Sequence, residues 1–184
     1  MIPAVSEALL IIDYQNDFAS PDGALYVRDG EKVADRINEL ARSGGFDLVV
    51  ATRDWHPPDH SSFEEQGGTW PVHCVQDTEG AQLHPSLDQS AVDIVFDKGQ
   101  NQATDGYSAF ETPELGELLR DREIDNITVV GLATDVCVKN TALEGLQEGF
   151  AVRVDSRAAR GVDLQPGDSD RALDEMRAAG AQVT

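Results

Sequence analysis

The stretch Gly131-Leu-Ala-Thr-Asp-Val-Cys137-Val-Lys-Asn-Thr-Ala142 joins an apolar run to a helical pattern, and the rest of the chain is interpreted around it. Residues 127–132 are typical of a buried strand, and apolar residues then recur at helical spacing until Gly149. Cys137 is therefore predicted at a strand-to-helix turn. Free backbone N–H groups and the positive end of the helix dipole lower a thiol pKa there and can hold an oxyanion. The turn suits a nucleophile, although a lone cysteine is also typical of a small buried apolar residue.

Outward from this turn, strand-like apolar runs alternate with amphipathic helical patterns. Strands are predicted at residues 8–13, 47–52, 91–96, 127–132, 151–154 and 181–183, and helices at 30–43, 112–119, 138–149 and 168–179. Continuously apolar strands are typical of parallel sheets covered on both faces. The order predicts an α/β fold: a three-layer, doubly wound, mostly parallel six-stranded sheet with helices on both faces and right-handed crossovers. Residues 1–184 are expected to form one domain, because that length buries one substantial core.

The composition limits the partners and the compartment. With 34 acidic against 14 basic residues, the formal net charge of −20 argues against nucleic acid and anionic membrane surfaces as partners. No apolar run approaches the ~20 residues that cross a bilayer, and the N-terminus lacks the pattern of a signal peptide. Two cysteines are too few for a disulfide framework, so a cytoplasmic protein is expected. The acidic excess with only three lysines resembles proteins of salt-rich cytoplasm; an ordinary acidic protein is the alternative.

Three chemically distinct residues follow predicted strands. Asp13, Lys98 and Cys137 lie at or just after strand ends, and in open α/β sheets ligands bind at the carboxyl ends of the strands. Together they supply a base, a cation that favours thiolate, and a nucleophile, which suits acyl transfer on an amide. Taken singly, Asp13 also fits a loop-start carboxylate bonded to backbone, and Lys98 fits a surface residue.

The long segment 53–91 has little periodicity and holds both tryptophans and all four histidines, which indicates a functional loop. Its Asp54, His56, His60 and His73 are ligand types that suit Zn²⁺, Fe²⁺ or Mn²⁺, and the Asp54-x-His56 spacing points two of them to one side. The alternative is a set of loop histidines that only form hydrogen bonds. Three other residues are interpreted as structural: Asp59 as a turn former, His84 as a surface residue and Cys74 as core packing.

Five stretches, in order along most of the chain, carry a family resemblance: IIDYQNDF (11–18), ATRDWH (51–56), WPVHC (70–74), FDKG (96–99) and GLATDVCV (131–138). The chain resembles the nicotinamidase family within the isochorismatase-like cysteine hydrolases. The resemblance implies the doubly wound six-stranded parallel sheet. It also implies hydrolysis of nicotinamide to nicotinate and ammonia, a step of NAD salvage, through a thioester.

The same resemblance implies roles for particular residues. It implies a catalytic triad of Asp13, Lys98 and Cys137. It implies one divalent metal ion on Asp54, His56, His60 and His73, with Zn²⁺ preferred over Fe²⁺ and Mn²⁺, which would position the pyridine nitrogen. It implies an oxyanion hole from the backbone N–H groups of Ala133 and Cys137, with a cis peptide before Ala133. Finally, it implies that Phe18, Trp70 and Tyr107 line the nicotinamide ring.

Two other functions compete with this one. A related hydrolase of the superfamily could act on another small amide, another pyridine carboxamide or a vinyl ether, but isochorismatase-type members lack the three-histidine cluster. A metal-binding module that had lost activity would have a broken triad, whereas all three residues are present here. The expected partner is a small neutral substrate, and the sequence leaves a homo-oligomer open.

Overall fold

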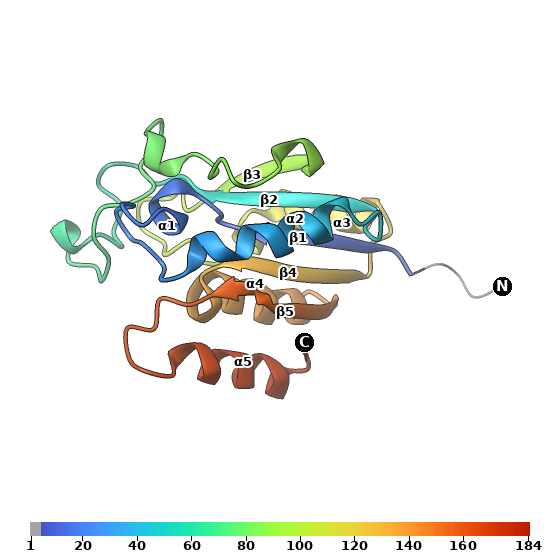
Figure 1. Ribbon diagram of the computed structural model, residues 1–184. Helices are drawn as coiled ribbons and strands as arrows, with labels where there is room; N and C mark the ends of the chain where they lie inside the picture. The colour runs from blue at the N-terminus through green and yellow to red at the C-terminus, as the bar shows by residue number, and fades with distance from the viewer. Residues whose placement is uncertain (1–4) are drawn as a thin grey trace.

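The computed structural model describes residues 5–184, which form one six-stranded sheet with every strand pairing parallel (Figure 1). The strand order is β3-β2-β1-β4-β5-β6. The strands are β1 (Glu7–Ile12), β2 (Leu48–Asp54), β3 (Ile94–Lys98), β4 (Asn126–Leu132), β5 (Ala151–Arg160) and β6 (Gln182–Val183). This sheet confirms the predicted doubly wound fold and makes it wholly, rather than mostly, parallel.

Helices cover both faces of the sheet. They are α1 (Asn16–Ala19), α2 (Ala34–Arg42), α3 (Pro113–Asp121), α4 (Lys139–Gln147) and α5 (Asp168–Ala179). In Figure 1, α2 lies in front of the sheet, while α3 and α4 lie behind it. Proline at the first position of α3 fits the helix start, because its missing N–H would have no partner there, and Gly180 ends α5 in the left-handed conformation. Within residues 5–184, no helix has the length and apolar character of a membrane span.

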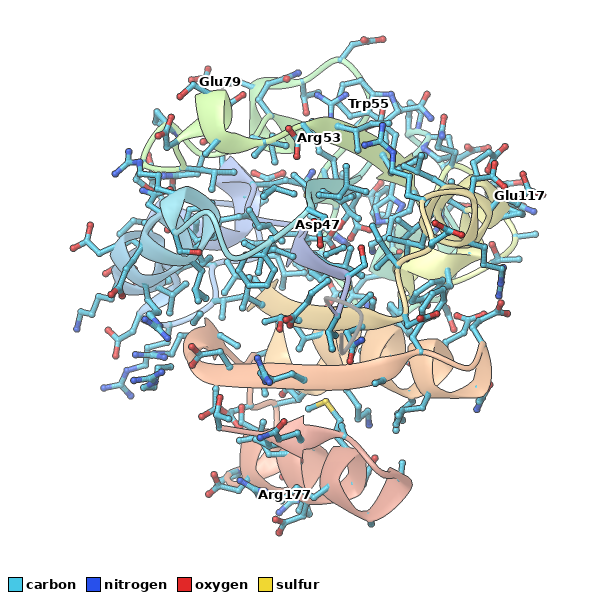
Figure 2. The ribbon with its side chains drawn as sticks, turned by 90° about the vertical axis from the view of Figure 1, so that its right-hand side faces the viewer. Asp47, Arg53, Trp55, Glu79, Glu117 and Arg177 are labelled. Atoms are coloured by element: carbon cyan, nitrogen blue, oxygen red, sulfur yellow. The ribbon has the colours of Figure 1, made fainter. Side chains whose placement is uncertain are left out.

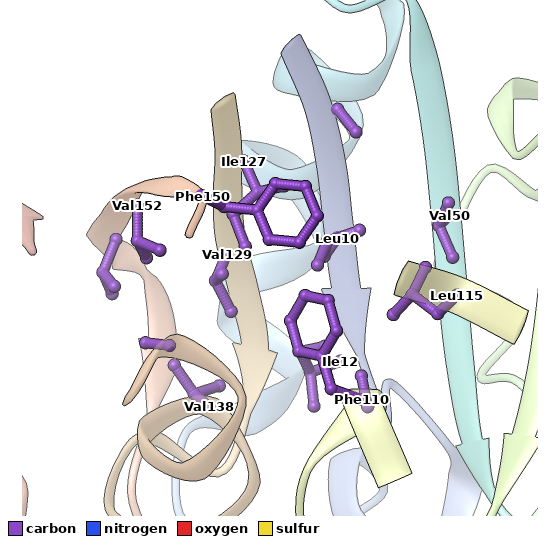
Figure 3. Close-up of a cluster of buried hydrophobic side chains, with 14 of the residues drawn as sticks. Leu10, Ile12, Val50, Phe110, Leu115, Ile127, Val129, Val138, Phe150 and Val152 are labelled. Atoms are coloured by element: carbon purple, nitrogen blue, oxygen red, sulfur yellow. The ribbon is translucent and has the colours of Figure 1, made fainter. Parts of the chain in front are cut away.

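The central strand β1 explains why the core has two halves. Its residues Ala8 to Ile12 are fully buried, and successive side chains point to opposite faces of the strand. Leu10 and Ile12 belong to the buried cluster that α3, α4 and α5 cover, and Figure 3 shows them on the same face as Phe110 and Leu115; Leu9 and Ile11 belong to the cluster on the α2 side. An apolar run without alternation therefore serves both layers at once, as expected for a parallel strand.

Several elements differ from the sequence prediction, and β2 continues to Asp54, past its predicted end at residue 52. β3 begins at Ile94 rather than residue 91, because Gln89–Ala91 forms a 3-10 turn that the Asp88 side chain caps. β5 continues to Arg160, past an irregularity in its pairing with β4, so its second half was not predicted. The first turn of the predicted helix 30–43 is the 3-10 turn Gly30–Val33, and the four-residue helix α1 was predicted as loop.

The strand order places several strand ends side by side. From β1 the chain first adds β2 and β3 on one side and later β4, β5 and β6 on the other, which makes the β1/β4 boundary the topological switch point. Gly131 on β4 has φ of +111°, and a Cβ there would lie 2.2 Å from the backbone oxygen of Ile12. Only glycine allows β4 this close to β1, immediately before the turn that carries Cys137.

Candidate active site

The structure brings Asp13, Lys98 and Cys137 together at the carboxyl edge of the sheet. Asp13 follows β1 in a left-handed conformation (φ 47°), and Lys98 is the last residue of β3. Cys137 lies in a π-helical turn, Thr134–Val138, between β4 and α4, so the predicted strand-to-helix turn is present. All three side chains are buried, at 0%, 2% and 5% exposed.

Lys98 is the centre of this group. Its Nζ donates hydrogen bonds to Asp54 Oδ1 at 2.6 Å and to the Gly106 carbonyl at 2.8 Å, and it lies 3.6 Å from Cys137 Sγ. It also forms an ion pair with Asp13 Oδ2 at 2.8 Å. Two carboxylates therefore share one buried ammonium group, which compensates for taking their charges out of water.

The two carboxylates differ in pKa because their surroundings differ. Burial and the neighbouring Asp54 charge raise the pKa of Asp13 to about 6, with Lys98 opposing them. Burial acts on Asp54 as well, but Lys98 and His56 outweigh it and hold the pKa of Asp54 well below its usual range. Asp54 is thus a fixed anion, and Asp13 is a carboxyl group that can gain and lose a proton near neutral pH.

The prediction that Cys137 has a lowered pKa is wrong for the free site. Burial raises the pKa of Cys137 well above its ordinary value, and the pull of Lys98 does not overcome it. Ligand atoms of Asp13, Asp54 and Cys137 lie within 4.8 Å of one another, so a proton acceptor is at hand. Cys137 therefore rests as a thiol beside a carboxyl group that can take its proton.

Asp54 links this group to a cluster of histidines. Asp54, His56 and His73 offer ligand atoms within 4.8 Å of one another. The Nε2 atoms of His56 and His73 lie 3.4 Å and 4.0 Å from Asp54 Oδ2. The Asp54 carboxylate therefore joins two of the three predicted histidine ligands to the predicted triad, with Oδ2 towards His56 and His73 and Oδ1 towards Lys98; His60 is not within 4.8 Å of all the other ligand atoms.

The hydrogen bonds of the histidines fit metal binding. His56 Nδ1 lies 2.7 Å from the Gly99 carbonyl, and His73 Nδ1 lies 2.7 Å from the Pro71 carbonyl. A carbonyl only accepts, so each Nδ1 carries a proton and Nε2 is the ring atom left to bind a metal, as in metal-bound histidine. Burial also lowers the pKa of His73 to about 4, which keeps the ring neutral.

His60 lies beside this set. Its ring stacks on that of His56 with centroids 4.0 Å apart, and its Nδ1 lies 2.7 Å from Ser62 Oγ. Its Nε2 is buried and has no hydrogen-bond partner within residues 5–184. A buried nitrogen without a partner is costly in a folded protein, and a cation would supply one. The donor set therefore fits one divalent cation.

A small pocket opens beside the nucleophile and the metal ligands. It encloses about 370 Å³ of space between its walls and the solvent. Phe18, Trp70 and Tyr107 line it, as do Ala133 and Cys137 of the strand-to-helix turn. Trp70 Nε1 donates to the Tyr107 hydroxyl at 3.1 Å, which fixes these two rings relative to each other. The peptide bond between Leu132 and Ala133 is cis.

The remaining residues singled out from segment 53–91 have structural surroundings. Asp59 is exposed in a turn and accepts a hydrogen bond from Gln102, and Cys74 is fully buried in the core. His84 is half-buried rather than a surface residue, because its ring packs edge-on against Tyr14.

Other residues of the site were missed from the sequence. Thr52 Oγ1 donates to Asp13 Oδ1 at 2.7 Å and orients that carboxylate. The Gly106 carbonyl accepts from Lys98, and the Gln15 carboxamide pairs with the backbone of Asp54. Thr52 offered a weak signal, since it lies at the end of a predicted strand; the contacts of a backbone carbonyl leave no sequence signal.

Comparisons with known proteins place these features in a family context. A protein-family model described as "Isochorismatase domain" matches residues 7–184. The chain is 46% identical over 200 residues to the nicotinamidase of Escherichia coli (strain K12), covering 96% of this chain and 93% of the relative. It is 42% identical over 186 residues to the nicotinamidase/pyrazinamidase of Mycobacterium tuberculosis, covering 96% and 97% of the two chains.

Solved structures agree with these relatives. PnC1 from L. infantum in complex with nicotinate superposes with a TM-score of 0.93 at 36% identity, covering 98% of this chain and 92% of that one. The pyrazinamidase of Pyrococcus horikoshii in complex with zinc superposes with a TM-score of 0.88 at 41% identity, covering 97% and 98%.

Proposed function

The chain belongs to the isochorismatase family, and from that premise we propose that it is an amidohydrolase that converts nicotinamide to nicotinate and ammonia. One observation carries the proposal: a single buried carboxylate, Asp54, joins a nucleophile–base–lysine group to a cluster of histidines at the wall of one pocket. The similarity to nicotinamidases and to a relative bound to nicotinate supports it.

In the first half of the reaction, Cys137 Sγ attacks the carboxamide carbon while Asp13 accepts the thiol proton. Backbone N–H groups of Ala133 and Cys137, which line the pocket, would stabilise the oxyanion. The C–N bond then breaks, and the protonated Asp13 returns its proton to the departing ammonia. This leaves a thioester between Cys137 and the pyridine carbonyl.

In the second half, Asp13 accepts a proton from a water molecule that attacks the thioester carbonyl. The C–S bond breaks, the proton passes from Asp13 to Cys137, and the product leaves as nicotinic acid, which loses its remaining proton to solvent to give nicotinate. A pKa of about 6 suits both transfers, because the carboxyl group exchanges its proton at little cost near neutral pH. Lys98 stays charged throughout, since Asp13 and Asp54 raise its pKa well above the ordinary value despite its burial.

We further propose that Asp54, His56, His60 and His73 hold one divalent cation, Zn²⁺ in preference to Fe²⁺ or Mn²⁺. When bound, such a cation would act as a Lewis acid and hold the pyridine ring in position. The aromatic side chains of Phe18, Trp70 and Tyr107 would cover the ring faces and keep bulk water from the thioester.

The decisive experiment measures ammonia release from nicotinamide by purified protein before chelation, after chelation, and after readdition of Zn²⁺, Mn²⁺ or Fe²⁺. We expect activity before chelation, loss after it, and recovery with at least one ion. Pyrazinamide is the natural second substrate to test, because the Mycobacterium tuberculosis relative and the Pyrococcus horikoshii structure are both named as pyrazinamidases. Metal-loaded protein that leaves nicotinamide and pyrazinamide intact would overturn the proposal.

A further inference from the structure

The buried side chain of Gln15 has no role in the reaction above, yet it forms hydrogen bonds with the backbone of Asp54, a proposed metal ligand. Gln15 is fully buried in the loop between β1 and α1. Its Nε2 donates to the carbonyls of Asp54 and Ala81, both at 2.8 Å, and its Oε1 accepts from the Asp54 N–H at 2.8 Å. The carboxamide thus pairs with both backbone groups of Asp54, as a neighbouring strand would.

The Gln15 side chain takes the place of a strand neighbour that Asp54 lacks at this end of the sheet. Asp54 is the last residue of β2, and Gln15 lies beyond the end of β1 at Ile12, where the neighbouring strand no longer offers backbone partners. Buried backbone groups need hydrogen bonds, and the side chain supplies them for the Asp54 N–H and carbonyl. A glutamine suits this position, because it can donate twice and accept with one flat group.

We propose that Gln15 is a positioning residue for the metal site: its carboxamide fixes the backbone of Asp54 and thereby the direction of the Asp54 carboxylate. That carboxylate must meet Lys98 with one oxygen and face His56 with the other, so a small rotation would disturb both groups. The inference rests on the proposed metal site. Outer-shell partners of metal ligands have effects of this kind.

Gln15 also ties Asp54 to a second segment. Its bond to the Ala81 carbonyl, together with an isolated bridge between Gln15 and Leu83, joins the β1–α1 loop to residues near the end of the long loop. Loss of the carboxamide would leave the N–H and carbonyl of Asp54 and the Ala81 carbonyl without this partner. The N–H and the carbonyl that lose their partner at Asp54 belong to a proposed metal ligand.

The test compares metal affinity in Gln15→Ala, Gln15→Met and Asn16→Ala. Zn²⁺ dissociation constants are measured by competition with a chromophoric chelator, and kcat and KM are measured at saturating Zn²⁺. Asn16 is the matched control, because its Nδ2 donates to the Glu79 carbonyl at 2.8 Å and so joins the same two segments without touching Asp54. Gln15→Met keeps the length of the side chain and removes its hydrogen bonds, and it decides the question if Gln15→Ala does not fold.

We expect a ~10–100-fold weaker Zn²⁺ affinity in both Gln15 variants, a change below about twofold in Asn16→Ala, and substantial recovery of kcat at saturating Zn²⁺. Circular dichroism and melting of the metal-free proteins identify variants that are folded. Folded Gln15 variants with wild-type Zn²⁺ affinity, or an equal loss in Asn16→Ala, would overturn the proposal. Metal affinity is measured without nicotinamide, so this result is independent of whether the protein hydrolyses that substrate.

Discussion

At the scale of single residues, the site shows how one lysine can set two carboxylates to different tasks. Asp13 and Asp54 are both buried and both contact Lys98, yet the pKa of Asp13 is raised to about 6 while that of Asp54 is lowered. At Asp13, burial and the charge of Asp54 outweigh Lys98; at Asp54, Lys98 and the nearby histidines outweigh burial. In the proposed reaction, proton transfer and cation binding are thereby divided between two chemically identical side chains.

The nucleophile is the first residue to test. Replacing Cys137 with alanine removes the protein group that attacks the substrate carbon in the proposed reaction, so ammonia release should fall by at least ~10³-fold. Metal content should stay at the wild-type level, because Cys137 is not among the proposed ligands. Ammonia assay and elemental analysis of the same preparation measure both. Wild-type turnover in this variant would contradict the mechanism.

A pH-dependent contribution to stability is expected from Asp155, which is remote from the proposed ligands in sequence. Asp155 is 3% exposed and pairs with Arg36 at 2.8 Å and Arg157 at 3.2 Å. Burial opposes ionisation, but the two arginines prevail and lower the pKa of Asp155. The folded state therefore favours the carboxylate, and its stabilising effect is full above the unfolded pKa of ~3.9 and disappears as the pH falls through the folded value.

Asp155→Asn should accordingly lower the free energy of unfolding by about 1 kcal/mol at pH 7, since the arginines are partly exposed and solvent screens them. Melting curves from pH 7 down to about pH 2 should show a constant difference above about pH 4 and the two proteins converging below it, as the carboxylate becomes protonated. Asp174→Asn is the control, because Asp174 is paired with Arg177 at the surface and 76% exposed. A difference that is constant across this pH range would show that charge is not the cause.

At the scale of elements, the close approach of β1 and β4 is what brings the base and the nucleophile together. Gly131→Ala would place a Cβ 2.2 Å from a backbone oxygen of Ile12, which cannot rotate away. We expect a loss of about 3 kcal/mol or more in the free energy of unfolding, with reduced activity in whatever fraction folds. Chemical denaturation of the metal-free proteins measures it.

Gly149→Ala separates the effect of a positive φ from the effect of a steric clash, both of which oppose alanine at Gly131. Gly149 has φ of +95°, but a methyl group added there would meet nothing within 4 Å, so only its backbone conformation opposes alanine. A loss of about 1 kcal/mol is expected there. Equal losses at Gly131 and Gly149 would mean that the contact with β1 contributes nothing.

The sequence predicted most elements that carry the site and missed the contacts between them. Asp13, Lys98 and the Cys137 turn were found because apolar runs mark strands and strand ends gather ligands. The second half of β5 was missed because it contains the polar run Asp155-Ser156-Arg157, which is typical of a loop. The pKa direction at Cys137 was wrong because burial depends on the packing of distant segments, which local sequence does not reveal.

At the scale of the whole molecule, charge dominates the surface. Figure 2 shows Asp47, Glu79 and Glu117 on separate parts of the molecule, in keeping with a formal net charge of −20. Such an excess of one sign destabilises the compact state through repulsion. Basic partners are few, since the chain has 14 lysines and arginines against 34 acids.

Salt should therefore stabilise the protein. The Debye length falls from ~10 Å at 0.1 M to ~3 Å at 1 M, so most surface repulsion is screened across that range. The melting temperature of metal-loaded protein should climb between roughly 0.1 M and 2 M KCl, with activity retained, because the substrate is neutral and the charges of the site are close and buried. A melting temperature that stays flat or falls over this range would contradict the interpretation of the acidic surface as an adaptation to salt.

The central place of β1 has a consequence for synthesis of the chain on the ribosome. β1 precedes the other five strands of this sheet along the chain, yet it lies in the middle of the sheet and pairs with both β2 and β4. Until residues 126–132 have left the exit tunnel, one edge of β1 has no strand to pair with, and the apolar face that α3 and α4 later cover is open to water. During most of translation β1 is therefore a half-paired strand with an exposed apolar face, which is the kind of segment that aggregates unless something covers it.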